Sequence, residues 1–178
     1  IDGNDIGKRI IGHELSLSQY QAFSTAMSEI TLHATQYAMG SVIVQIDAET
    51  KDEDYPRQLN DIRTSTSRLL ELPIRPIIVG GDDCTIVIEA QYAILFAEAY
   101  ITEFRRLSRL PENTKNLMGE MEASAGIAFV KAKAPFASNY ELAEALCGHS
   151  KNALRERCSN ANGGYTPSAV TFHRVTTS

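Results

Sequence analysis

The sequence lacks tryptophan altogether and has only three cysteines among its 178 residues. Cys84, Cys147 and Cys158 form no CxxC pair, which leaves neither a zinc-binding cluster nor a disulfide framework. We therefore expect reduced thiols in a cytoplasmic protein, with Cys84 packed within a strand. No stretch approaches the roughly 20 consecutive apolar residues of a transmembrane helix, so we expect no membrane partner.

The sequence also has no excess of positive charge, because it contains 17 lysines and arginines and 22 acidic residues, which give a net charge of −5. A surface that coats nucleic acid is basic, so we expect no strong direct nucleic-acid surface. Nucleotide binding stays open, because a few local cations and a metal ion suffice for it. The length fits one domain. Because the chain opens at Ile1 inside a motif, we expect residues 1–178 to be a single domain excised from a longer chain.

The stretch from Pro76 to Ile88 is organised around Gly80-Gly81-Asp82-Asp83, which two runs of β-branched aliphatic residues flank. This pattern predicts a β-hairpin with both strands buried and two carboxylates at its tip. Adjacent like charges repel, and carboxylates in such surroundings need protons, hydrogen bonds or cations. Hard divalent cations such as Mg²⁺ are their usual partners. An ordinary tight turn is the alternative, since glycine and aspartate are common turn residues.

The first residues, Ile1 to Gly7, predict the end of a strand that runs into a glycine-bounded turn, with a short helical turn over Lys8–Ile11. A carboxylate at a strand end, here Asp2, followed by exposed backbone N–H groups suits a metal ion with a bound phosphate. A polar N-terminal loop without a ligand is the alternative.

The rest of the chain alternates helical and extended patterns. The predicted elements are a helix from Leu17 to Tyr37 stopped by Gly40, a strand over Ser41–Asp47, an exposed loop over 48–56, a helix within 59–70, a helix within 93–109, a central strand over Ser124–Val130, a helix begun by a Ser138/Glu141 capping box, a loop over 160–165 and an edge strand over Val170–Val175.

These elements predict an α+β fold in which helices cover one face of a sheet. In such a sheet the end of the first strand and the tip of the hairpin can lie side by side. Asp2 and Asp82 then converge, with Asp83 beside them. Two or three carboxylates on adjacent strands can hold one or two Mg²⁺ ions, about 3.5–4 Å apart, together with a nucleoside triphosphate.

Five motifs in this order resemble the GGDD palm domain, of polymerase and cyclase type, from the large subunit of type III CRISPR effector complexes. The resemblance extends from residue 1 to about residue 175, and the same palm core is shared more distantly with GGDEF-type diguanylate cyclases and class III nucleotidyl cyclases. The motifs are Asp2-Gly3-Asn4 with Ile6-Gly7, Gly80-Gly81-Asp82-Asp83, Ser124-Ala125-Gly126-Ile127, Lys133-Ala134-Pro135-Phe136 and Ser150-Lys151.

The resemblance implies a ferredoxin-like palm with an antiparallel-type sheet that binds ATP with Mg²⁺ or Mn²⁺. It also implies an antiviral function, in which the palm joins ATP into cyclic oligoadenylate second messengers. Carried over by position, the metal ligands are Asp2, Asp82 and Asp83, of which Asp82 and Asp83 are catalytic. The nucleotide-binding residues are Gly3, Asn4 and Asp5 under the triphosphate, Gly80 and Gly81 at the bare hairpin tip, and Lys151 near the phosphates.

Departures from the family pattern keep other functions open. The stretch 41–56 resembles an insertion, and Ser150 stands where a small apolar residue is expected. Family members carry two palms that face each other, so a lone palm needs a second palm, a homodimer partner or CRISPR effector subunits for turnover. The alternatives are an ATP-binding or assembly module without turnover and a cyclase like the GGDEF or class III enzymes.

Overall fold

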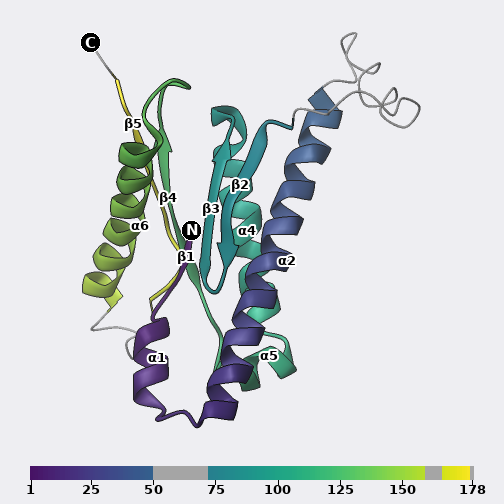
Figure 1. Cartoon of the computed structure of the whole chain (residues 1–178), viewed down its shortest axis with the longest axis vertical. Coiled ribbons are helices and arrows are strands. Elements are labelled where there is room, and N and C mark those ends of the chain that lie inside the picture. Colours follow the sequence, from purple (N-terminus) through teal and green to yellow (C-terminus); the bar gives the residue numbers. More distant parts are fainter. Residues whose placement is uncertain (50–71, 159–165, 177–178) are drawn as a thin grey trace.

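Five strands form one sheet in the order β2-β3-β1-β4-β5 in the computed structural model, which describes residues 1–49, 72–158 and 166–176 (Figure 1). Neighbouring strands are antiparallel, except that β4 and β5 are parallel. The strands are β1 (Asp2–Gly3), β2 (Ile74–Gly80), β3 (Asp83–Ile88), β4 (Ala123–Phe129) and β5 (Val170–Arg174).

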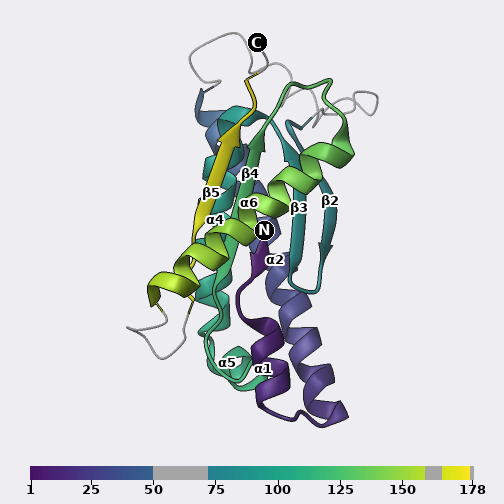
Figure 2. The same cartoon turned by 90° about the vertical axis from the view of Figure 1, so that its left-hand side faces the viewer.

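Helices lie on both faces of this sheet. Figures 1 and 2 show α2 and α4 against one face and α6 across the other. The predicted α+β, palm-type fold is confirmed. The helix cover extends beyond the one face that we expected, because parallel β4 and β5 need a crossover connection, which α6 supplies. The helices are α1 (Ile6–Gly12), α2 (Leu17–Glu49), the short 3₁₀ helix η2 (Ala90–Tyr92), α4 (Ala93–Ser108), α5 (Pro111–Asn116) and α6 (Phe136–Cys158).

Helix α2 is longer than the sequence predicts. The predicted stop at Gly40 and the predicted strand over Ser41–Asp47 are both wrong, since α2 continues to Glu49. Ala34, Ala38 and Val42 are fully buried and extend one apolar stripe along the helix. Packing of this stripe against α4 and the sheet therefore outweighs the strand preference of the β-branched residues. Residues 50–56 of the predicted loop and insertion, and the predicted helix within 59–70, lie outside the described residues.

The predicted hairpin is confirmed as β2 and β3, joined by a turn at Gly81 and Asp82. Gly81 has a φ of +59°, which favours glycine. The prediction that both strands are buried is wrong, because Ile78 and Val87 are 43% and 47% exposed. Strand β2 lies at the sheet edge, and α6 packs on β4 and β5 instead.

The C-terminal part follows the predicted order with one correction. The central strand and the edge strand are confirmed as β4 and β5. The predicted capping box is wrong, because α6 begins at Phe136 and the Ser138 hydroxyl donates to the Pro135 carbonyl oxygen at 3.2 Å from inside the first turn. Pro135 directly precedes the first residue of α6, a position that proline tolerates because the first turn of a helix needs no N–H donor there. The predicted loop over 160–165 lies outside the described residues.

Candidate functional site

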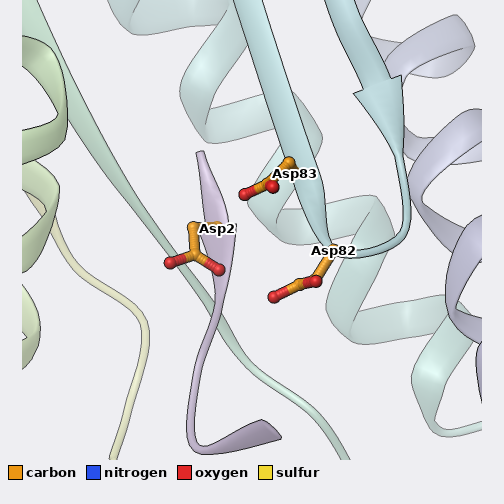
Figure 3. Close-up of side chains that lie close together, drawn as sticks. All are labelled: Asp2, Asp82 and Asp83. Carbon is orange, nitrogen blue, oxygen red and sulfur yellow. The ribbon is translucent and has the colours of Figure 1, made fainter.

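Three carboxylates converge where β1 meets the hairpin. Asp2 and Asp83 lie directly opposite each other across the antiparallel pair of β1 and β3, so both side chains stand on the same face of the sheet. Asp82 reaches the same place from the hairpin turn, as Figure 3 shows. One oxygen from each of the three carboxylates lies within 4.8 Å of the others. This group is the acidic trio.

Buried contacts beneath the acidic trio fix the hairpin tip. Ile1 and Cys84 exchange two backbone hydrogen bonds, of 2.8 and 2.9 Å, which join β1 to β3. From α2, the Thr31 hydroxyl donates to the Gly81 carbonyl oxygen at 2.8 Å. The Thr35 hydroxyl lies 3.4 Å from the sulfur of Cys84, which is buried in its strand as predicted. Sequence reasoning missed these threonines, whose signal was two polar residues on the apolar face of α2.

The electrostatics of the trio favour a bound cation. Burial raises the pKa of Asp82 to about 6, and the hydrogen bond with Asp2 and the charges of Asp2 and Asp83 act in the same direction. Below about pH 6, in the absence of a metal ion, Asp82 therefore keeps its proton. Carboxylate oxygens are the donors that Mg²⁺ and Mn²⁺ prefer. The donor set therefore fits either ion, and within the described ranges no other group of His, Cys, Asp and Glu side chains has such geometry.

Lys151 approaches the trio from α6. Its Nζ donates to the Asp2 carboxylate and, at 2.8 Å, to the carbonyl oxygen of Gly3. The residue is only 8% exposed. Lys151 is therefore not a solvated helix lysine, and it places a positive charge directly beside one of the three carboxylates.

Glycines leave room around the trio. A Cβ on Gly3 would lie 2.5 Å from Cδ1 of Ile6 and 3.2 Å from Cβ of Asp82, so the bare backbone of Gly3 lets the hairpin turn come close to β1. By contrast, no described atom lies within 4 Å of a Cβ built on Gly80 or Gly81. The side of the hairpin tip that these two glycines present is thus open.

Asn4, which the family resemblance places under the triphosphate, is held by hydrogen bonds within the protein. The residue is 3% exposed, and its side-chain nitrogen donates to the carbonyl oxygens of Thr166 and Pro167, at 3.2 and 2.9 Å. Its backbone N–H donates to Glu122 at 2.8 Å. Asn4 therefore anchors the segment after β1 to the segment before β5.

Asp5 is also engaged by the protein. It adopts φ 60° before α1, and its carboxylate pairs with Lys8 and Arg155, each at 3.2 Å. Burial works to raise the pKa of Asp5, but hydrogen bonds from Thr166 and Lys8 and the two positive charges lower it overall. Asp5 thus joins α1 to α6 rather than completing the acidic trio.

A second buried network, which was not predicted from the sequence, is centred on Glu122, directly before β4. The carboxylate of Glu122 is 4% exposed, pairs with Arg105 at 3.0 Å and accepts a hydrogen bond from the Ser168 hydroxyl. Its backbone oxygen holds Asn4, as described above. Arg105 and Glu122 are 17 positions apart along the chain, so only the fold reveals this pair.

A sheet with helices on both faces and an acidic trio at a hairpin tip defines a palm-type domain. Residues 1–159 match the family described as Cas10/Cmr2, second palm domain. The chain therefore belongs to this family, the palm of the large subunit of type III CRISPR effectors, and the resemblance noted from the motifs is confirmed. No curated protein matches the chain. Over the described residues, none of the helices has the length and apolar character needed to cross a membrane.

Proposed function

We propose that this palm binds ATP with Mg²⁺ or Mn²⁺ at the acidic trio and contributes to joining ATP into cyclic oligoadenylates for antiviral defence. The observation that carries the proposal is the convergence of Asp2, Asp82 and Asp83 within 4.8 Å. Three carboxylates so close together repel one another strongly unless cations or protons compensate them. A folding role alone gives no reason to gather them at an open hairpin tip.

The residues of the trio and those around it have different roles in this proposal. Asp2 and Asp82 hold the ion or ions, and Asp83 is a third ligand or supports the other two. Gly80 and Gly81 offer an open surface beside the ion, because no described atom occupies the space of their missing side chains. Lys151 already contacts Asp2, and it would bind the phosphates of a nucleotide held at the same ion. Its compact charge with three donors suits a phosphate contact.

The chemistry follows from charge and position. Bound Mg²⁺ or Mn²⁺ supplies Lewis-acid charge that lowers the pKa of an attacking 3′-hydroxyl and stabilises a leaving pyrophosphate. Asp82 and Asp83 would hold the ion together with Asp2, and the bare hairpin tip would leave room for the triphosphate. One palm offers one acidic trio, so a second palm or a homodimer partner is needed to present the second nucleotide.

A second candidate function is ATP binding without turnover, as a sensor or assembly module. The salt bridge between Lys151 and Asp2 favours it, because a protein cation already neutralises one of the carboxylates. Family membership implies that the domain works within a multi-subunit CRISPR effector, where either function has a place. A GGDEF-like or class III cyclase reaction would use the same trio and is distinguished by its product.

Calorimetry with Mn²⁺ and ATP, and separately with GTP, tests the proposal. We expect metal-dependent ATP binding that the double variant Asp82→Ala, Asp83→Ala loses while its fold, followed by circular dichroism, is retained. Incubation with ATP and a partner palm then separates the two candidates, since synthesis gives oligoadenylate and pyrophosphate whereas a sensor returns ATP. Binding by the double variant equal to that of the unaltered chain would contradict the proposal.

A further inference from the structure

One flank of α6 carries Lys151, which contacts Asp2 of the acidic trio, and the rest of this flank has no assigned role. Residues spaced three and four apart share one side of a helix. Lys151 and Arg155 fix the direction of this side, since they reach Asp2 and Asp5 respectively. We call this side the Lys151 flank, and it consists of Tyr140, Glu144, Gly148, Lys151 and Arg155.

Gly148 is an unexpected residue at the middle of this flank. Glycine inside a helix costs stability relative to alanine, so its presence calls for a reason. Close packing is not the reason, because no described atom lies within 4 Å of a Cβ built on Gly148. Gly126 in β4 shows the contrast, since its Cβ would lie 2.1 Å from the Ala143 carbonyl oxygen. Gly148 instead leaves a bare strip of helix between Glu144 and Lys151.

Tyr140 lies toward the N-terminal end of the same flank, and Figure 2 shows the N-terminal part of α6 crossing in front of β3 in that view. Its hydroxyl donates to the Glu144 carboxylate at 2.8 Å, and its ring stacks on the half-exposed ring of Phe136 with centroids 6.1 Å apart. The hydrogen bond to Glu144 raises the pKa of the Tyr140 phenol most, and the charge of Asp83 adds to this rise. The ring is therefore within electrostatic reach of the hairpin tip.

We propose that the Lys151 flank is the wall against which the nucleoside of the bound ATP lies, with Gly148 giving clearance for the ribose and Tyr140 stacking on the base. This inference rests on the proposed function and adds the part of the site that recognises the nucleoside. Phosphates bound at the trio lie beside Lys151, and the nucleoside extends from them along the helix. An aromatic ring at the far end then meets the base, whose π-face stacks on aromatic side chains.

Filling the bare strip tests the role of Gly148. In Gly148→Leu we expect the affinity for Mn·ATP to fall at least about tenfold, while the affinity for Mn²⁺ alone stays within about twofold. Gly40→Leu is the matched control, because Gly40 is also a helical glycine with no described atom within 4 Å of its Cβ, on α2 at the other face. It should bind Mn·ATP like the unaltered chain. Gly148→Leu binding Mn·ATP within twofold of the unaltered chain would overturn the inference.

Inorganic tripolyphosphate separates the nucleoside contact from the phosphate contact. Because the base would lose its stacking partner, we expect Tyr140→Leu to weaken Mn·ATP binding about tenfold and to leave Mn·tripolyphosphate binding unchanged. Tyr140→Phe, which keeps the ring, should bind both like the unaltered chain. Equal losses for both ligands in Tyr140→Leu, or no loss, would overturn the inference.

The unaltered chain distinguishes the two levels of the proposal. If it binds Mn·ATP no more tightly than Mn·tripolyphosphate, the metal and phosphate site stands and the nucleoside wall is overturned. If it binds neither ligand while correctly folded, the proposed function fails, and the nucleoside wall fails with it. Tighter binding of Mn·ATP, lost in Gly148→Leu and Tyr140→Leu, supports both.

Discussion

The ammonium group of Lys151 is bonded to the carboxylate of Asp2, although 149 positions separate the two residues along the chain. Lys151 comes from α6 and Asp2 from the two-residue strand β1, so this contact ties the helix to the centre of the sheet. In the absence of a metal ion, Lys151 is the protein cation that offsets the charge of the trio. Under the proposed function, a divalent cation at Asp2 would take over that role.

The first prediction concerns this exchange of cations. In Lys151→Met, the metal-free protein loses the charge that compensates Asp2, so we expect a loss of about 2 kcal/mol in the free energy of unfolding, moderated by the partial exposure of Asp2. Mn²⁺ should recover most of the loss. Thermal unfolding in EDTA and in MnCl₂ measures this, and the rise on adding Mn²⁺ should be larger in Lys151→Met than in the unaltered chain.

Lys133→Met is the control for this experiment, because Lys133 is an exposed lysine outside α6. It should leave both melting temperatures unchanged. An identical Mn²⁺ response in Lys151→Met and the unaltered chain would show that Lys151 and the cation do not share Asp2.

The second prediction is a pH dependence set by Asp82, whose pKa is about 6 in the folded protein against a reference value of 3.8. Between these pH values the folded state holds a proton that the unfolded state has released. The contribution of Asp82 to stability is therefore fully present below pH 3.8 and is lost as the pH rises through 6. Above pH 6, the carboxylate charge destabilises the metal-free fold.

Asp82→Asn removes that charge. We expect it to stabilise the metal-free protein at pH 8 by about 1 kcal/mol, after allowance for solvent screening, and to have little effect at pH 4.5. The same variant should lose the stabilisation that Mn²⁺ confers. Denaturant unfolding at the two pH values, with EDTA or MnCl₂, checks both halves. Destabilisation at pH 8 in EDTA would mean that Asp82 is held by contacts that outweigh its repulsion from Asp2.

A third prediction follows from the hydroxyl that supports the hairpin turn. Thr31→Val keeps the shape of the side chain but removes its hydrogen bond to Gly81, which should cost about 1 kcal/mol. Because this bond fixes the turn that carries Asp82, Mn²⁺ affinity should also fall, as calorimetry can measure. Ser41→Ala on the same helix removes a hydroxyl bond to the Tyr37 carbonyl oxygen at 3.1 Å and should leave Mn²⁺ affinity unchanged.

The sequence was informative about the trio because strand ends and hairpin tips follow from local patterns. Gly80-Gly81-Asp82-Asp83 predicts a turn, and a carboxylate at the end of the adjacent strand is expected to lie near the tip of that hairpin. Asp2 could therefore be predicted to lie near Asp82 without knowledge of any long-range contact. The exposure of the hairpin strands could not be predicted in this way, because a run of β-branched residues has the same pattern whether or not a helix covers the strand.

The length of α2 and the role of Lys151 depend on tertiary contacts that no local pattern reports. Val42 belongs to a β-branched run that favours a strand, and only its burial in line with Ala38 keeps the helix going. Lys151 is a helix lysine with an ordinary surface interpretation until α6 crosses the sheet beside Asp2. Both cases concern which surface an element meets, which the sequence specifies only through the whole fold.

The fourth prediction tests the crossing that delivers Lys151 to the trio. A Cβ on Gly126 would lie 2.1 Å from the Ala143 carbonyl oxygen and 2.5 Å from the Cys147 nitrogen, both backbone atoms of α6 that cannot turn aside. Gly126→Ala should therefore cost about 3 kcal/mol and push α6 away from β4. Because α6 carries Lys151, the contact with Asp2 is lost too.

Thermal unfolding and Mn·ATP calorimetry measure both consequences of Gly126→Ala, and Gly40→Ala is the matched control. No described atom lies within 4 Å of a Cβ on Gly40, so alanine there should raise helix stability by up to about 1 kcal/mol and leave Mn·ATP binding intact. If Gly126→Ala behaves like Gly40→Ala, then α6 does not pack directly on β4. In that case neither Lys151 nor the rest of its flank is held beside the acidic trio by this packing.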